Sequence, residues 1–254
     1  MNTKFKNILI TGASSGIGRA LAIFYAANGA ENLFLCGRHA ERLAATQKEC
    51  EKYAVKVHTA IVDITDREAV QKWIAECNQT ALLNLVIANA GVASLEEKNA
   101  NIYRTFDTNV YGVLNTILPT IEIYGQRQDE APRAIAMLSS IAGYHGLAGC
   151  PSYSASKACV KAYGEALRVY LRPQKIQVSV ICPGFVKSGI TDKNTCPMPF
   201  LMAGEKAAGI IAGRLEKNVG LIAFPWPMRL AVWFLSILPN RLSSFICSLL
   251  PYKV

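Results

Sequence analysis

The sequence predicts an α/β protein: a doubly wound, mostly parallel sheet of seven strands with helices on both faces, followed by an apolar helical extension at the C-terminus. Three observations lead to this prediction. Short apolar runs without polar alternation recur along the chain, as expected of strands that are buried on both faces. Segments with helical spacing separate these runs, so strand and helix alternate. A turn with three glycines follows the first strand.

The chain begins with its clearest strand–helix pair. The run NILIT at 7–11 stops at Gly12, and the segment 17–29 has helical spacing and ends at Gly29, a residue suited to a helix C-terminus. Further strands are expected at 32–37, 55–62, 83–91, 134–140, 176–184 and 220–225. Further helices are expected at 40–53, 66–78, about 100–125, 152–172 and 203–217.

The composition narrows the class of protein. The 254 residues contain no linker, repeat or low-complexity run, and 51% are apolar, so one domain with a sizeable core is expected. The net charge of +9 comes from scattered basic residues, which indicates a solvated basic surface and no nucleic-acid partner. Eight cysteines without a CxxC pair, and no recognisable signal peptide, predict reduced thiols in a cytoplasmic protein. The three histidines do not cluster with cysteines or acids, so no metal site is expected.

The turn TGASSGIG at 11–18 predicts a phosphate-binding site. Ligands of open parallel sheets bind beyond the carboxyl ends of the strands, and this turn directly follows the first strand. Gly12, Gly16 and Gly18 allow backbone N–H groups to approach a pyrophosphate, and the helix that begins near Gly16 directs its positive dipole end at that anion. An ordinary glycine-rich turn is the weaker interpretation, because three hydroxyl residues share the segment.

The end of the second strand predicts which dinucleotide binds. An acidic residue there would hydrogen-bond the 2′-hydroxyl of the adenosine ribose and repel a 2′-phosphate. The sequence instead has Gly37 and Arg38, and a guanidinium can hold a phosphate through two parallel charge-assisted bonds. NADP(H) is therefore expected in preference to NAD(H). The alternative is that Arg38 is a solvent-exposed residue at a helix start.

The segment YSASK at 153–157 places Tyr153 four residues before Lys157. On a helix these two positions are neighbours on one face. A free tyrosine has a pKa near ~10, and a nearby ammonium group favours the phenolate and lowers that value. Such a pair also arises by chance, so it indicates a reaction centre only together with the rest of the chain.

Taken together, these pieces resemble the short-chain dehydrogenase/reductase family. The matching segments, in the family's order and close to its spacing, are TGASSGIG (11–18), VDIT (62–65), ANAG (88–91), NVYG (109–112), LSSIAG (138–143), YSASK (153–157) and PGFVKS (183–188). They cover about residues 5–225. The sequence departs from the family at Ala88, where a second Asn is common, and at Ser188, where Thr is commoner.

The resemblance implies a Rossmann-like sheet, a nicotinamide cofactor and a catalytic set of Asn109, Ser140, Tyr153 and Lys157. Ser140 is preferred over its neighbour Ser139 because it stands 13 residues before Tyr153, close to the family's spacing. The expected cofactor contacts are Gly12, Ser14, Ser15, Gly16, Ile17, Gly18, Arg38, Asp63, Asn89, Ala90, Gly91, Tyr153, Lys157, Pro183, Gly184, Val186 and Ser188.

Hydride transfer to a carbonyl needs a proton donor and a group that stabilises the oxygen anion. We expect Tyr153 to be the acid in reduction and the base in oxidation, and Lys157 to lower its pKa and hold the nicotinamide ribose. Ser140 would hydrogen-bond the substrate oxygen, and Asn109 would support Lys157 through a water. The reaction expected is hydride transfer between nicotinamide and a carbonyl or secondary alcohol. Alternatives are a non-catalytic redox sensor that holds the nucleotide, and a membrane-associated scaffold.

The family holds its substrate with the segment at about 187–203 and with the C-terminus, and we expect Tyr144, His145, Leu147 and Phe185 to be near the substrate. The segment 187–203 is interpreted as a candidate lid. An apolar C-terminus favours an apolar carbonyl or alcohol, such as a long-chain, acyl or steroid-like compound. The family also suggests a homodimer or homotetramer that pairs through the helices at about 100–125 and 152–172.

The chain divides into residues 1–225, the dinucleotide-binding and catalytic part, and 226–254, an apolar extension. Two apolar stretches, 230–238 and 242–250, are separated at Pro239, and each is too short to span a bilayer. Three interpretations of the extension stay open: peripheral contact with the cytoplasmic face of a membrane, folding over the substrate cleft, and burial in an oligomer.

Overall fold

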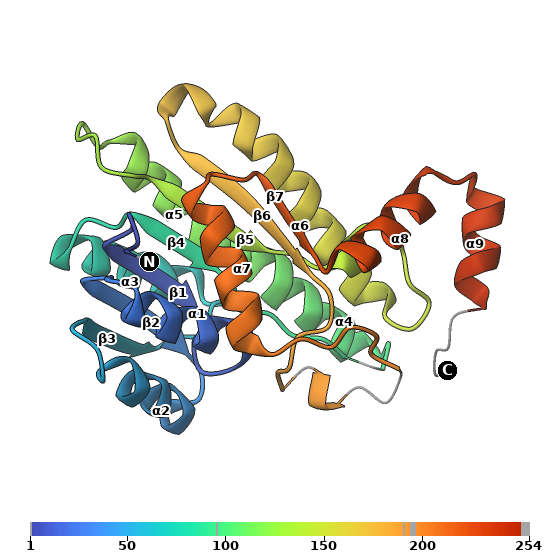
Figure 1. The fold of residues 1–254 in the computed structure, drawn as a ribbon, viewed down its shortest axis with the longest axis horizontal. Helices are drawn as coiled ribbons and strands as arrows, with labels where there is room; N and C mark the ends of the chain where they lie inside the picture. The colour runs from blue at the N-terminus through green and yellow to red at the C-terminus, as the bar shows by residue number, and fades with distance from the viewer. Residues whose placement is uncertain (1, 95, 190, 194–196, 250–254) are drawn as a thin grey trace.

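The computed structural model describes residues 2–94, 96–189, 191–193 and 197–249. Its seven-stranded sheet has the order β3-β2-β1-β4-β5-β6-β7, and all neighbouring strands run parallel (Figure 1). The strands are β1 (Asn7–Thr11), β2 (Asn32–Gly37), β3 (Lys56–Ile61), β4 (Leu85–Ala88), β5 (Ala134–Leu138), β6 (Gln177–Pro183) and β7 (Leu221–Phe224). The predicted Rossmann-like α/β fold is therefore confirmed, and the sheet is parallel throughout.

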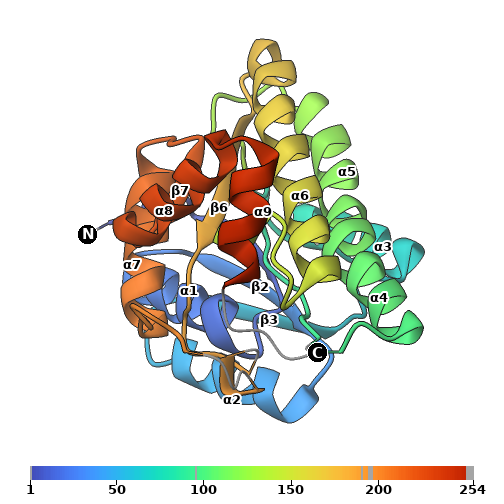
Figure 2. The same ribbon diagram turned by 90° about the vertical axis from the view of Figure 1, so that its right-hand side faces the viewer.

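Helices cover both faces of the sheet (Figure 2). They are α1 (Gly16–Ala27), α2 (Ala40–Cys50), α3 (Arg67–Thr80), α4 (Asn99–Phe106), α5 (Gly112–Gly125), α6 (Pro151–Tyr170), α7 (Gly204–Glu216), α8 (Trp226–Ile237) and α9 (Asn240–Ser248). Side chains alternate across β1: Ile8 and Ile10 join a core with α1, α2 and α7, whereas Leu9 joins a second core with α3, α5 and α6. The strands inside the sheet are buried on both faces, which is why their sequences are continuously apolar, whereas the edge strand β3 has no fully buried residue.

The strand order reverses at β1, which lies between β2 and β4. The chain moves outward from β1 to β2 and β3, returns to β4 on the other side, and then continues to β7. A crevice for ligands forms at such a switch point, beyond the carboxyl ends of the strands. The turns after β1 and β4 therefore face each other at the edge where the predicted site residues lie.

The long helix expected at about 100–125 is divided in the structure. A π-helical turn, Asp107–Tyr111, lies between α4 and α5. A π turn inserts an extra residue into a helix, and such turns occur frequently at functional sites. This turn contains Asn109, whose side chain is fully buried.

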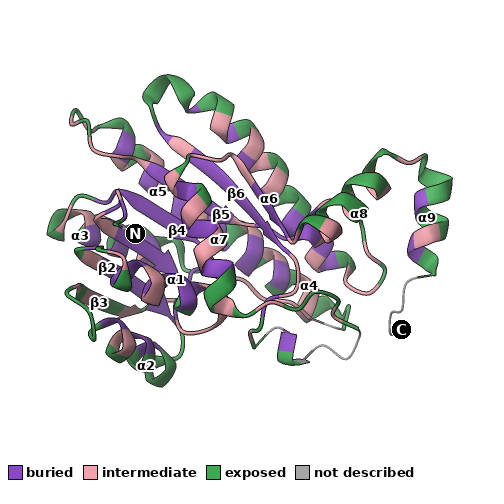
Figure 3. Ribbon diagram, viewed as in Figure 1, coloured by how far each residue is buried: buried purple, intermediate pink, exposed green. Residues whose placement is uncertain are grey.

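The C-terminal helices α8 and α9 extend from the main body of the molecule (Figure 1). Pro239 lies between them, as the sequence predicts for a helix-breaking residue. Much of their surface is exposed (Figure 3). Among the described residues, no helix has both the length and the apolar character that crossing a membrane requires.

Candidate active site

The three glycines of the turn after β1 stand where the backbone packs too closely for a side chain. Gly12 has φ +67°, and a Cβ atom there would lie 2.7 Å from the Cα atom of Ala90. A Cβ atom on Gly18 would lie 2.4 Å from the carbonyl oxygen of Gly12. Gly16 also has a positive φ of +54° and packs against Ser188. The turn is thus compressed against its neighbours, so backbone N–H groups line its surface.

The start of α1 fits an anionic group. Ser15 precedes the helix without capping it through its side chain, and the first turn of α1 contains no acidic residue. Ile17 is partly buried against the core below, which anchors that turn. On the other side, Ser14 lies beside Gly37 at the end of β2, because a Cβ on Gly37 would be 3.1 Å from the Ser14 hydroxyl oxygen. The donors that a pyrophosphate needs are therefore present.

Hydrogen bonds join the turns after β1 and β4. The Asn89 side-chain amide donates to the carbonyl oxygens of Thr11 at 2.8 Å and Gly12 at 3.2 Å. In return, the Thr11 hydroxyl accepts from the backbone N–H groups of Asn89 and Ala90, each at 3.1 Å. Thr11 is a positioning residue that the sequence reasoning did not single out, although it begins the TGASSGIG segment.

Arg38 and Asp63 meet at the ends of β2 and β3. Their closest charged atoms are 3.6 Å apart, and both side chains are about half exposed. Partial burial tends to raise the pKa of Asp63, but hydrogen bonds from Thr65 and the positive charge of Arg38 outweigh it, so this pKa is lowered. The Asp63 carboxylate also accepts from the Thr65 N–H at 3.0 Å and the Thr65 hydroxyl at 2.9 Å. Asp63 can thereby orient Arg38 at the edge of the crevice.

Ser140, Tyr153 and Lys157 gather where β5 ends and α6 begins. The Lys157 ammonium nitrogen lies 5.8 Å from the centre of the Tyr153 ring, on the same helix face, and donates to the Leu138 carbonyl oxygen at 2.8 Å. The Ser140 side chain interacts with the Tyr153 hydroxyl. The neighbouring Ser139 is used differently, since its hydroxyl donates to the Lys157 carbonyl oxygen at 2.6 Å and fixes α6 against the strand. The structure thus brings the predicted Ser140, Tyr153 and Lys157 together.

Burial has the largest effect on the pKa values of Tyr153 and Lys157. It raises the pKa of Tyr153 to about 12, although the contact with Ser140 acts in the opposite direction. It lowers the pKa of Lys157 to about 8. The sequence-based expectation was a Tyr153 pKa below the ordinary value, so the structure differs here. The physical reason is that both charged forms lose hydration in this site, and Lys157 directs its charge at a backbone carbonyl.

The π turn places Asn109 next to Lys157. The Asn109 side-chain oxygen accepts from the Val92 N–H at 2.8 Å, and its amide donates to the Val92 carbonyl at 2.9 Å and to the Ser156 hydroxyl at 3.1 Å. A Cβ atom on Gly91 would lie 3.1 Å from the Asn109 oxygen and 3.3 Å from the Lys157 nitrogen. Both groups therefore border Gly91, and only a glycine leaves space between them.

The segment after β6 closes the other side of the site. The side chain of Pro183 is buried in β6, and Gly184 packs under α8, where a Cβ would lie 2.9 Å from the Met228 sulfur. Val186 is buried and pairs with Met202, and the Ser188 N–H donates to the Thr191 hydroxyl at 2.8 Å. The expected substrate segment 187–203 includes residues 190 and 194–196, which lie outside the described residues.

Of the expected substrate contacts, Tyr144 is the most closely packed. It follows Ser140 through a single 3-10 turn, Ile141–Gly143, and the Lys161 ammonium lies 4.7 Å from the centre of its ring. Its buried hydroxyl has no hydrogen-bond partner among the described residues. His145, Leu147 and Phe185 are partly buried.

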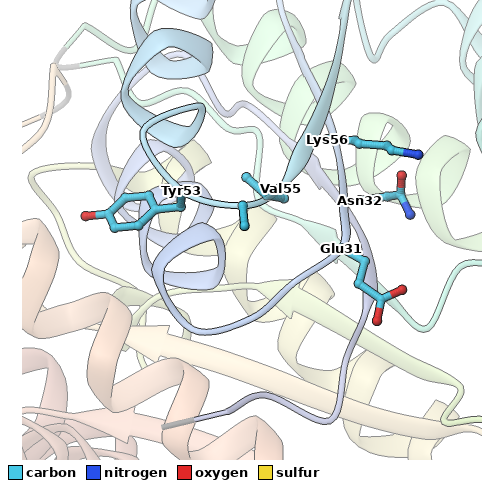
Figure 4. Close-up of a pocket in the computed structure, with 6 residues that line it drawn as sticks. Glu31, Asn32, Tyr53, Val55 and Lys56 are labelled. Atoms are coloured by element: carbon cyan, nitrogen blue, oxygen red, sulfur yellow. The ribbon is translucent and has the colours of Figure 1, made fainter.

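A pocket of about 480 Å³ lies elsewhere, at the amino ends of β2 and β3. Its lining side chains, including Glu31, Tyr53 and Lys56, point away from one another (Figure 4). They do not converge on a common point, so this pocket forms no part of the site. Within the described residues, no group of three or more His, Cys, Asp or Glu side chains could hold a metal ion.

Comparison with known proteins gives consistent results. Residues 6–197 match the profile of the family described as short chain dehydrogenase. An uncharacterized oxidoreductase of Myxococcus xanthus is 35% identical over 94% of this chain and 94% of its own. Sulfoacetaldehyde reductase 2 of Chromohalobacter salexigens is 34% identical over 72% of this chain and 74% of its own. A crystal structure of a short chain dehydrogenase/reductase of Burkholderia phymatum in complex with NAD superposes with a TM-score of 0.80 at 24% identity. The match covers 89% of this chain and 91% of that chain, and it shows a likeness of fold.

Proposed function

This chain belongs to the short-chain dehydrogenase/reductase family and is an NAD(P)-dependent oxidoreductase, and within that class we propose that it transfers hydride between NADP(H) and an apolar carbonyl or secondary alcohol. The observation that carries the proposal is the meeting of Ser140, Tyr153 and Lys157 beside the glycine-rich turn, at the carboxyl edge of the sheet. A proton donor, an ammonium group and a hydroxyl thus lie where the nicotinamide end of a bound dinucleotide would be expected.

The proposed roles follow from the contacts of each residue. When bound, the nicotinamide supplies hydride to the carbonyl carbon or accepts it from the alcohol carbon. In reduction, the Tyr153 hydroxyl donates its proton to the substrate oxygen, which becomes the alcohol; in oxidation, the phenolate takes that proton back. The Ser140 hydroxyl hydrogen-bonds the same oxygen and stabilises its developing charge.

Lys157 and Asn109 support this proton transfer. The Lys157 ammonium is nearly fully buried and lies 5.8 Å from the centre of the Tyr153 ring, where its charge opposes the effect of burial, which still dominates and raises the Tyr153 pKa. Asn109 and Lys157 border Gly91 from two sides, which supports a bridging water between them. The ribose hydroxyls of the dinucleotide would be held by Tyr153 and Lys157, and its pyrophosphate by the turn from Gly12 to Gly18.

The preference for NADP(H) rests on Arg38. No acidic residue stands at the end of β2, and Arg38 is half exposed there, with Ser14 nearby and Asp63 as its ion partner. The exposed half of the guanidinium is free to bind a 2′-phosphate through charge-assisted hydrogen bonds. The resulting site would accept NAD(H) more weakly, because part of its binding energy depends on that phosphate.

The remaining parts of the proposal concern substrate, assembly and location. The apolar helix α8, which contacts the 3-10 turn directly after Ser140, supports an apolar substrate such as a long-chain, acyl or steroid-like compound. Exposed apolar residues on the helices α5 and α6, such as Leu118 and Tyr170, support a homodimer or homotetramer. Unpaired cysteines in the described part of the chain support a cytoplasmic location, including the cytoplasmic face of a membrane.

The decisive experiment measures the loss of NADPH absorbance with a panel of apolar ketones and aldehydes, with Tyr153→Phe as the matched variant. The variant keeps the ring but lacks the proton donor, so its turnover should fall by about 10²–10⁴-fold while NADPH still binds. NADPH binding is followed separately by fluorescence. Near-normal turnover of Tyr153→Phe would show that the proton comes from another group, and absence of turnover by the wild type with every carbonyl would favour nucleotide binding without catalysis.

A further inference from the structure

The solvent-exposed face of α8 is apolar, although the exposed face of a surface helix is normally polar. Trp226, Leu230, Trp233 and Ile237 follow one another at helical spacing and form one stripe, with Phe234 beside it. Their exposed fractions are between 50% and 74%. The opposite face, with Met228, Val232 and Leu235, is only partly buried.

The helix α9 continues this surface. Leu242, Phe245 and Leu249 occupy its exposed face at spacings of three and four residues, with exposed fractions from 47% to 69%. The residues that α9 buries are the small Ser243 and Cys247. Its largest exposed side chains are thus apolar, whereas its two buried side chains are small, which is unlike a helix that packs its large apolar side chains on a protein core. The exposed apolar residues of α8 and α9 are called the C-terminal apolar face below.

The positive charge of this region indicates which kind of partner covers the C-terminal apolar face. Glu216 is the last acidic residue of the chain, and the sequence beyond it contains Lys217, Arg229, Arg241 and Lys253. Arg229 and Arg241 are exposed at α8 and α9. A second copy would bring an equally basic tail against this one, and the two would repel each other. A surface with an apolar interior and negative headgroups complements both the stripe and the charges.

We therefore propose that the C-terminal apolar face docks on a lipid bilayer that contains anionic headgroups. The aromatic side chains of Trp226, Trp233, Phe234 and Phe245 enter the boundary between headgroups and acyl chains, and Arg229 and Arg241 bind lipid phosphates. The described residues 226–249 are then a membrane-contacting extension of the catalytic part.

Docking at this face places the reaction centre close to the membrane. The start of α8 packs on Gly184 and on the 3-10 turn Ile141–Gly143, which directly follows Ser140. Both α8 and α9 lie at the end of the molecule where the strands β6 and β7 finish (Figure 2). An apolar substrate dissolved in the bilayer would have a short path to the site. This consequence rests on the proposed function, whereas the docking itself does not.

The test uses the full chain and vesicles of phosphatidylcholine, with and without phosphatidylserine. Trp226 and Trp233 are exposed and the third tryptophan, Trp73, is 8% exposed, so a blue shift of tryptophan emission on adding vesicles reports the C-terminal face. We expect the wild type to shift and to co-sediment with the anionic vesicles, and binding to weaken by about tenfold or more in high salt or on neutral vesicles.

Matched variants locate the contact. The double variant Trp233→Gln with Phe234→Gln should lose about tenfold or more of the vesicle affinity, and Arg241→Glu should lose the preference for anionic lipid. The control, Tyr53→Gln with Leu82→Gln, removes apolar residues of similar exposure that follow α2 and α3, and it should bind as the wild type does. Unchanged NADPH binding in each variant shows that the fold is intact.

Several outcomes would overturn the proposal. The wild type could fail to bind either vesicle, or the Trp233/Phe234 variant could bind as tightly as the wild type. The third outcome comes from light scattering of the protein without lipid. If the protein is an oligomer that the Trp233/Phe234 variant no longer forms, and if it does not bind vesicles, the C-terminal apolar face is an interface with a second copy. None of these measurements depends on turnover, so they separate the membrane contact from the catalytic proposal.

Discussion

Lys157 illustrates how a residue of the proposed reaction centre can lower the stability of the fold. Its ammonium is 2% exposed and has a backbone carbonyl of Leu138 as its hydrogen-bond partner. Burying a charge without an opposite charge is unfavourable, and the lowered pKa expresses that cost. A residue chosen for stability alone would be apolar here.

The pH dependence of unfolding measures this cost. The pKa of Lys157 falls from 10.5 in the unfolded chain to about 8 in the fold, so the unfolded chain binds more protons between these values. The cost is fully present below pH 8 and is lost as the pH rises towards 10.5. Relative to Lys157→Met, the wild type should therefore gain about 3 kcal/mol of unfolding free energy across this window. Urea unfolding of both proteins checks it, and a pH-independent difference would contradict it.

The proposed preference for NADP(H) depends on a single side chain, that of Arg38. Removing its guanidinium in Arg38→Ala deletes the charge-assisted bonds to a 2′-phosphate, so the KM for NADPH should rise about 10–100-fold while the KM for NADH stays within about twofold. Steady-state kinetics with both cofactors measure this. Lys48→Ala, which removes an exposed cation from the last turn of α2, is the control. A wild type that prefers NADH would refute the assignment.

At the scale of elements, regular periodicity was predictable and its interruption was not. The strands and helices lie within a few residues of their expected positions because buried parallel strands and amphipathic helices leave clear patterns. The π turn at Asp107–Tyr111 leaves no such pattern. It is held by tertiary contacts, since the Asn109 side chain bonds Val92 on one side and Ser156 of α6 on the other.

The order of the strands unites the site at the scale of the whole molecule. Site residues from the turns after six strands, β1 to β6, lie along one edge because all the strands are parallel, with β1 and β4 as neighbours at the point where the strand order reverses. Asn89 joins the two turns directly through its bonds to Thr11 and Gly12. A ligand that bridges these turns should therefore stabilise the whole fold.

Thermal unfolding tests this coupling between ligand and fold. At a hundredfold excess over its Kd, a ligand that binds only the folded chain adds about 2.7 kcal/mol of stability. For a chain of this size that corresponds to a rise in Tm of about 5–10 °C. NADPH should give a larger rise than NADH at equal concentration, and Arg38→Ala should remove the difference between them. Equal shifts with both cofactors in the wild type would contradict the proposed preference.

The sequence by itself determined the alternation of strand and helix, the parallel sheet, the family and the positions of the motifs. These depend on local periodicity and on glycines that no other residue can replace, and both are visible in one dimension. Only the tertiary structure decided how Ser139 and Ser140 divide their contacts, why the pKa of Tyr153 rises, and that the C-terminal helices turn their large apolar side chains outward. Desolvation and exposure depend on what surrounds a residue in space, and neighbours in space are not neighbours in the chain.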